Sequence, residues 1–196
     1  MLKKVTLLTA TALTAFAMNT GEININNKDL EVSAQLDVGQ FYDTVEPNTM
    51  FVGAKFLNAD ADHSDNEKAD LDPYFEANFL MMREVGNSGM RLGMGMKGSF
   101  TKDFAAVPLG LEFSYKIPAN SYVPMHLNGE VYYAPSVLAF SDADSFLEYR
   151  ISFDVEIIKN GMVTVGYRTL DTNYETEKGG DFTYNSYAYL GFKIRF

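Results

Sequence analysis

The sequence predicts an all-β protein: a single antiparallel up-and-down transmembrane β-barrel with a lipid-facing apolar exterior and a polar lumen. Three observations lead to this fold class. Apolar and polar residues alternate over segments about ten residues long, short and long connections follow one another between these segments, and an amphipathic segment ends on Phe196. Segments of this length suit a tilted strand that crosses the hydrocarbon core of a membrane, whereas globular strands average about 5–6 residues.

The composition excludes several other classes. The 196 residues are 46% hydrophobic and 21% charged, which is typical of one folded domain rather than of a disordered chain. With 16 Lys and Arg against 26 Asp and Glu, the formal net charge is −10. We expect no nucleic-acid partner, because phosphate binding needs a cationic surface. Past residue 18, no apolar run approaches the ~20 residues of a spanning helix, and the chain has no Cys that could form disulfide bonds.

The first 17 residues have the pattern of a signal peptide. Lys3 and Lys4 form a cationic start, residues 5–16 are apolar but too short to remain as a spanning helix, and a small-x-small pattern ending at Ala17 suits a signal peptidase. We therefore expect residues 1–17 to be cleaved off. Residues 18–196 then form one barrel domain in the outer membrane of a Gram-negative envelope.

The alternation is clearest in residues 147–157. The odd positions there are all apolar or aromatic, and the positions between them are Glu148, Arg150, Ser152, Asp154 and Glu156. Such a period of two predicts strands with one apolar face and one polar face. Three other segments repeat the pattern: residues 90–97, 107–115 and 187–196.

Connection lengths indicate which face points outward. In a soluble periplasmic lipocalin-like carrier the apolar face would point inward, and in an outer-membrane barrel it points toward lipid. Short turns on one side and long loops on the other are typical of outer-membrane barrels. The connections at residues 84–89, 117–121 and 159–161 are short, whereas those at 58–72, 134–145 and 171–183 are long and polar. The pattern favours the membrane barrel, with the soluble carrier as an alternative.

Ten strands are expected, because closure with both ends on one side needs an even number. The first strand is short. A barrel of eight strands, with residues 18–40 lining it or lying outside it, is the alternative. The ten expected strands are residues 22–26, 30–39, 49–57, 73–83, 89–99, 106–116, 122–133, 146–158, 162–170 and 184–196.

The turn at Lys159-Asn160-Gly161 predicts a hairpin register. A three-residue loop sets Val155 opposite Val165, apolar against apolar, whereas a two-residue loop crosses the faces. We therefore expect a type I turn with Gly161 in the left-handed conformation.

The polar faces carry charges of both signs, which a narrow lumen tolerates only where they pair or stay hydrated. The hairpin register predicts a pair between Arg168 and Asp154. Such a lumen is either a salt-bridged polar core, in a structural or surface-interaction protein, or a gate in a narrow porin-like channel. The expected lumen charge network comprises Arg91, Glu112, His126, Glu130, Glu148, Arg150, Asp154, Arg168, Lys193 and Arg195.

Signals for catalysis are weak. His126 and Glu130 share one face but lie ~13 Å apart along a strand, and the consecutive residues His63, Ser64 and Asp65 cannot form a triad unaided. The sequence has no nucleophile elbow, zinc-ligand spacing or phosphate loop. We expect no enzyme activity, cofactor or metal site. The alternative is an enzyme acting on lipid or lipopolysaccharide, with His126 and Glu130 as its first candidates.

Three envelope partners are expected. The apolar faces would contact outer-membrane lipid. The acidic connection at residues 58–72 could be bridged to lipopolysaccharide by divalent cations. The barrel-assembly machinery would read a C-terminal insertion signal made of Leu190, Phe192, Ile194 and Phe196.

Two stretches carry a family resemblance. Residues 129–135 read GEVYYAP, a Ser- and Asp-rich loop follows, and residues 165–168 read VGYR. Together with the order of the strands, this resembles the YfaZ family of predicted outer-membrane proteins over most of the mature chain. The resemblance implies location and architecture, and it carries no catalytic or ligand residues.

Overall fold

The computed structural model describes residues 19–58, 72–102, 104–118, 123–141, 143–174 and 181–196. Twelve strands join in one sheet, with two short 3-10 turns, η1 (Val38–Gln40) and η3 (Ser136–Leu138), in the connections. Within these ranges no helix is both long and apolar enough to cross a membrane. The strands are β1 (Thr20–Ile25), β2 (Leu30–Asp37), β3 (Met50–Asn58), β4 (Tyr74–Glu84), β5 (Met90–Phe100), β6 (Phe104–Ala106), β7 (Leu109–Lys116), β8 (Met125–Ala134), β9 (Ala139–Ser141), β10 (Ala143–Ile158), β11 (Gly161–Tyr174) and β12 (Asp181–Arg195).

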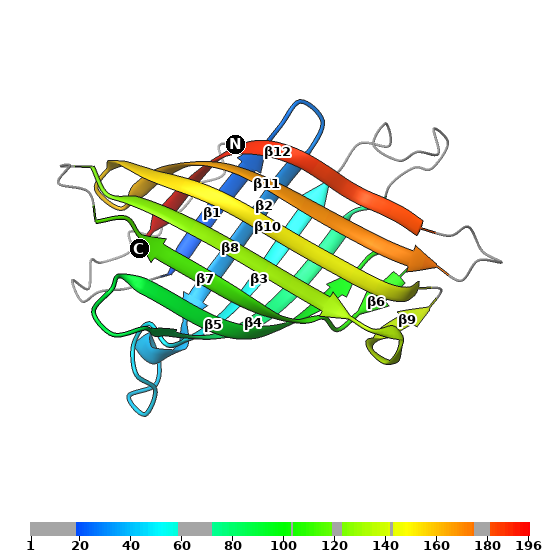
Figure 1. The fold of residues 1–196 in the computed structure, drawn as a ribbon, viewed down its shortest axis with the longest axis horizontal. Helices are drawn as coiled ribbons and strands as arrows, with labels where there is room; N and C mark the ends of the chain where they lie inside the picture. The colour runs from blue at the N-terminus through cyan, green and yellow to red at the C-terminus, as the bar shows by residue number, and fades with distance from the viewer. Residues whose placement is uncertain (1–18, 59–71, 103, 119–122, 142, 175–180) are drawn as a thin grey trace, which may run out of the picture.

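Ten of these strands close into one antiparallel barrel (Figure 1). The wall runs β1, β2, β3, β4, β5, β7, β8, β10, β11 and β12, and β12 pairs back onto β1, where Ile23 lies opposite Phe192. The ten-strand up-and-down barrel predicted from the sequence is confirmed. The eight-strand alternative is wrong, because β1 and β2 are hydrogen-bonded wall strands.

One expected strand is divided in two. The segment predicted at residues 106–116 becomes β6, which ends at Ala106, and β7, which begins at Leu109. Pro108 lies at the break, where its missing N–H cannot join a ladder. Because β6 pairs with the end of β5 and with β9, these two short strands extend the sheet past the barrel wall.

The β10–β11 hairpin keeps the predicted parity but not the predicted register. The three-residue loop is wrong: Ile158 pairs with Gly161, and Asn160 rather than Gly161 takes the positive φ, 64°. A bulge before Ile158 then sets Val155 opposite Val163. Asparagine tolerates this conformation because its short side chain can bond locally, and the bulge restores apolar pairing.

The two ends of the barrel differ. The turns at residues 85–89 and 159–160 lie where β1 begins and β12 finishes, which we call the short-turn end. The opposite end, which we call the loop end, has β6 and β9 and the connections that follow β3, β8 and β11 (Figure 1). Two connections depart from the expected rule: residues 26–29 form a tight turn at the loop end, and residues 38–49 form a longer connection at the short-turn end.

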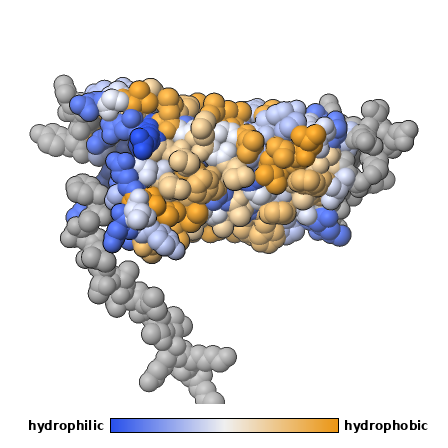
Figure 2. All heavy atoms as spheres, turned by 90° about the horizontal axis from the view of Figure 1, so that it is seen from below, coloured by the Kyte–Doolittle hydropathy of each residue, from blue (hydrophilic) through white to orange (hydrophobic). Residues whose placement is uncertain are grey.

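The polarity of the barrel is the reverse of a soluble protein's. Ile151 and Phe192 face outward and are 50% and 41% exposed, whereas the side chains of Arg150 and Lys193 face the lumen and are 12% and 15% exposed. Figure 2 shows apolar residues around the middle of the barrel and polar residues gathered toward its ends. The predicted apolar exterior and polar lumen are therefore confirmed.

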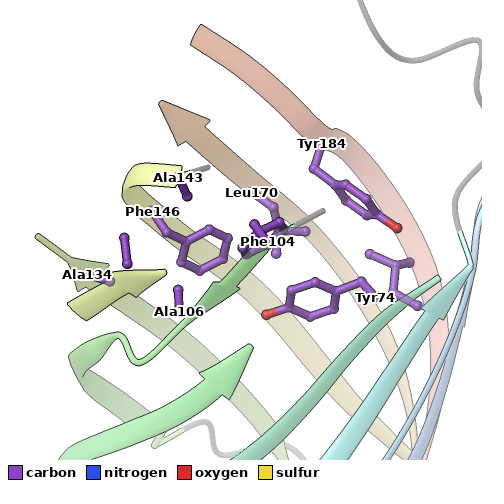
Figure 3. Close-up of a cluster of buried hydrophobic side chains, with 10 residues drawn as sticks. Tyr74, Phe104, Ala106, Ala134, Ala143, Phe146, Leu170 and Tyr184 are labelled. Atoms are coloured by element: carbon purple, nitrogen blue, oxygen red, sulfur yellow. The ribbon is translucent and has the colours of Figure 1, made fainter. Parts of the chain in front are cut away.

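The loop end of the lumen is filled by buried apolar side chains, which we call the apolar cap (Figure 3). The ring centroids of Phe104 and Phe146 lie 5.5 Å apart, and those of Tyr74 and Tyr184 lie 5.9 Å apart. Since β6 and β9 both contribute, the sheet extension helps to close this end. The cap comprises Leu57, Tyr74, Phe104, Ala106, Ala134, Ala139, Ala143, Phe146, Leu170 and Tyr184.

Candidate functional site: the barrel lumen

A first group of lumen charges centres on Glu148, which has no exposed surface. Its two oxygens accept hydrogen bonds from Lys55 Nζ at 2.8 Å and from Lys97 Nζ at 2.9 Å. Lys55 also donates to Glu76 at 2.7 Å, and Lys97 Nζ lies 3.4 Å from Glu130. Each buried ammonium thus contacts two or more carboxylates, which offsets the cost of removing it from water.

A second group continues the network toward β1 and β12. Glu31 of β2 accepts two hydrogen bonds from Arg150, at 2.9 and 2.7 Å, and a third from Arg168 at 2.7 Å. The Arg168 guanidinium also donates to Asn185 at 2.8 Å, and Asn185 donates to Asp29 at 2.6 Å. A guanidinium that is 1% exposed is therefore held by two carboxylates and an amide.

The two groups join where Arg150 Nε lies 3.1 Å from Glu130. On β3, Lys55 lies two positions nearer the short-turn end than Leu57 of the apolar cap. On β10, Glu148 lies two positions nearer that end than Phe146 of the cap. The lumen is therefore crossed by charge directly beneath the apolar cap. We call this network the charged belt: Asp29, Glu31, Lys55, Glu76, Lys97, Glu130, Glu148, Arg150 and Arg168.

A separate cluster surrounds Asp154 nearer the short-turn end. Asp154 accepts hydrogen bonds from Lys193 and Thr164, both at 2.8 Å, and from Asn128 at 2.9 Å. The predicted pair between Asp154 and Arg168 is wrong. The β10–β11 register places Arg168 opposite Arg150, which aims both cations at the carboxylates of β2 and the 26–29 turn.

Glycines on the lumen face make room for the large side chains of neighbouring strands. A Cβ on Gly110 of β7 would lie 2.5 Å from the ring of Tyr132, and one on Gly95 of β5 would meet its hydroxyl. The ring of Tyr132 fills this space with Lys97 Nζ 4.0 Å from its centroid, and its hydroxyl donates to Glu112 at 2.5 Å.

A cavity of about 200 Å³ lies between the charged belt and the short-turn end. Lys97 and Arg150 of the belt line its inner part, and Thr20, Arg91 and Arg195 line the part nearest the short-turn end. The lumen is therefore hollow on one side of the belt and filled by the apolar cap on the other.

The structure brings most of the predicted network together. Glu148 and Arg168 lie in the belt, and His126 is buried with Asp154 as its cross-strand partner. The remaining members line the cavity: Arg91, Glu112, Glu130, Arg150, Asp154, Lys193 and Arg195.

Sequence reasoning missed Glu31, Lys55, Asp29, Asn185 and Glu22. The sequence contains a signal for Glu31, because this residue occupies the polar face of an alternating segment. The sequence alone leaves the placement of residues 18–40 open between wall strands and a segment outside the barrel, so it does not assign Glu31 to the lumen. Asp29 lies in a turn, where parity assigns no face, and only the fold brings it to Asn185.

The candidates of the enzyme alternative do not form a joint site. Glu130 contacts Arg150, while His126 lies opposite Asp154. Residues 63–65 fall outside the described residues. Within the described ranges, no group of three or more His, Cys, Asp or Glu side chains could hold a metal ion.

The predicted insertion signal lies on the exterior. Leu190, Phe192 and Ile194 of β12 and the following Phe196 all point away from the lumen and are exposed. They belong to the apolar surface that surrounds the barrel.

Comparisons with known proteins place the chain in a family. No curated protein matches it. A chain in a solved structure described as "Unveiling the Mechanism Behind the in-meso Crystallization of Membrane Proteins" is 13% identical, with 91% of this chain and 83% of that chain covered and a TM-score of 0.37. A family model described as "YfaZ precursor" matches residues 2–196. The chain therefore belongs to the YfaZ family, as the resemblance predicted.

Proposed function

We propose that this protein is an integral β-barrel of the outer membrane with a structural or surface-interaction role and a non-conducting lumen. The observation that carries this proposal is the inverted polarity. Large apolar side chains are exposed on every wall strand, while the charged belt is buried. Soluble monomers rarely expose contiguous apolar patches larger than a few hundred Å². In a lipid bilayer these apolar side chains would contact acyl chains rather than water, so their exposure would carry no free-energy cost.

The two ends of the barrel support an orientation. Outer-membrane barrels have short periplasmic turns and longer external loops. The short-turn end, where β1 begins and β12 finishes, would then face the periplasm, and the loop end would face outward. The description of the family as a precursor fits an exported protein with the expected signal peptide at residues 1–17, which lie outside the described residues.

The partners follow from this orientation. Outer-membrane lipid would contact the apolar wall, and the barrel-assembly machinery would read the exposed β12 residues during insertion. Lipopolysaccharide, bridged by divalent cations, would meet the acidic connection at residues 58–72, of which residues 59–71 lie outside the described residues.

We propose that the protein is not an enzyme. His126 is 8% exposed and points into the lumen, where the barrel wall separates it from the surrounding lipid. Substitution His126→Ala should therefore leave the lipid and lipopolysaccharide profile of the envelope unchanged. A changed profile, with the barrel still folded, would favour the lipid-modifying alternative.

A narrow porin-like channel is the second candidate, and the cavity is the observation that favours it. The experiment that separates the two is electrophoresis of detergent-extracted membranes with and without boiling, followed by single-channel recording in planar bilayers. We expect a folded band that shifts on boiling and no conductance at any voltage. Discrete conductance steps would contradict the non-conducting lumen and favour the channel. Recovery of the protein in the soluble fraction would contradict both proposed functions.

A further inference from the structure

The 38–49 connection presents two adjacent aromatic side chains on its surface. Phe41 and Tyr42 are 64% and 63% exposed, which is more than any aromatic side chain of the described wall strands. Contact of these rings with water is unfavourable, because water solvates apolar surface poorly. Neighbouring exposed rings are typical of a surface that contacts another molecule. The pair therefore indicates a partner at the short-turn end.

The 38–49 connection is braced by its own contacts. The carboxylate of Asp37 accepts hydrogen bonds from the backbone N–H groups of Gly39 at 3.1 Å and of Asn48 at 2.7 Å, which joins the two ends of the connection. Gly39 lies against the backbone of Pro47, and a Cβ at this glycine would lie 2.6 Å from Pro47 Cα. Compact connections whose ends lie close together often carry function. The two rings are thus exposed in a defined backbone conformation.

The connection projects sideways from the barrel. Its base is attached to the wall, because Arg91 of β5 donates a hydrogen bond to the backbone carbonyl of Asn48. The N–H of Met82 in β4 donates to the carbonyl of Thr49 at 2.8 Å. From this base, the connection extends beyond the outline of the barrel at the lower left of Figure 1, rather than along the long axis. In the proposed orientation, this direction follows the surface of the periplasmic leaflet.

The outer wall is apolar up to the point where the connection begins. Leu36 of β2 and Val52 of β3 lie opposite each other next to the connection, and both side chains are exposed on the exterior. Met81 of β4 is also exposed, and it pairs with Met50, the first residue of β3. The two rings of the connection therefore continue the apolar surface that the proposed function assigns to lipid.

We propose that the 38–49 connection anchors the short-turn end of the barrel in the periplasmic leaflet, where Phe41 and Tyr42 insert at the boundary between headgroups and acyl chains. Aromatic side chains concentrate at this boundary in membrane proteins. The charged residues of the connection, Asp43 and Glu46, are both acidic and exposed. Anionic lipid would repel them, so the connection binds zwitterionic phospholipid through its acyl chains. This inference rests on the proposed outer-membrane location.

The test uses tryptophan fluorescence, because the chain has no Trp and one substitution therefore introduces a single fluorophore. Tyr42→Trp is folded into phosphatidylcholine vesicles that contain lipid brominated either near the headgroups or near the middle of the bilayer. Lipid brominated near the headgroups should quench its emission about two-fold or more, and more strongly than the deeper label. The matched control Asn87→Trp lies in the exposed 85–89 turn at the same end, so it should emit at a longer wavelength without quenching by either lipid.

Ile151→Trp tests the proposed function in the same vesicles, because Ile151 is exposed near the middle of β10. Each variant is first checked for a band that shifts on boiling. Quenching of Ile151→Trp by the deeper label, with Tyr42→Trp emitting like the control, overturns the anchor and leaves the proposed function in place. Absence of quenching in both variants overturns both proposals. Short-wavelength emission of Tyr42→Trp without quenching shows that a second copy of the chain covers the connection, which also overturns the anchor.

Discussion

Glu148 illustrates at the residue scale how a narrow barrel uses charge where a globular protein uses a hydrophobic core. It is fully buried, and each of its oxygens accepts a hydrogen bond from a different lysine. Removing one member of a buried ion pair is strongly destabilising, because it leaves charge without compensation in a medium of low polarity. Lys55 and Lys97 would have to rely on Glu76 and Glu130 alone.

We therefore expect Glu148→Gln, which keeps the shape and removes the charge, to lower the free energy of unfolding by about 3–5 kcal/mol. Equilibrium urea unfolding of the barrel in lipid vesicles, followed by circular dichroism, measures this change. Glu46→Gln is the matched control, because Glu46 is exposed in the 38–49 connection and should change the free energy of unfolding by less than about 0.5 kcal/mol. Equal effects of the two substitutions would show that the belt does not stabilise the fold.

Residue partners were harder to predict than residue faces. Parity correctly assigned Arg168 and Asp154 to the lumen, because the period of two is a local property of the strand. Their predicted pairing is wrong, because the observed register differs from the predicted one by two residues. Such a shift leaves each side chain on the same face of the sheet but moves its cross-strand partner two residues along the neighbouring strand. Long side chains then reach across the lumen, so that Arg168 of β11 meets Glu31 of β2.

At the scale of the element, the sequence predicted all ten wall strands, with ends displaced by a few residues. Two features escaped it for physical reasons. Pro108 ends the ladder but lies within an unbroken alternation, which hid the division into β6 and β7. At the 159–160 turn, a two-residue loop alone would set apolar residues of β10 opposite polar residues of β11. A bulge before Ile158 shifts the register by one residue and restores apolar pairing, and counting residues across the turn does not predict such a bulge.

At the scale of the whole molecule, the lumen is built in three layers. The apolar cap fills the loop end, the charged belt lies beneath it, and the cavity occupies the side of the short-turn end. The charged belt depends on contacts between strands far apart in the sequence, such as that of Lys55 in β3 with Glu148 in β10, and no local pattern encodes such contacts. The exterior differs in this respect, because alternation within each strand was enough to predict it.

The exterior also provides the most direct test of the membrane assignment. Ile151 is half exposed near the middle of β10, and Val137 is 78% exposed in η3 at the loop end. In water, replacing an exposed apolar side chain by Arg usually changes stability by no more than about 0.5 kcal/mol. On the lipid face of a barrel, the same change costs about 2–4 kcal/mol at the middle of the bilayer and about 0–1 kcal/mol near its surface.

We therefore expect Ile151→Arg to lower the free energy of unfolding in lipid vesicles by about 2–4 kcal/mol, and Val137→Arg by about 0–1 kcal/mol. Equilibrium urea titration of both variants and of the wild type measures the difference, with the band shift on boiling as the check that each variant folds. The contrast depends on depth within the bilayer, because the two side chains are both exposed in the isolated barrel. If both substitutions prove equally harmless, the apolar wall of this barrel does not contact acyl chains.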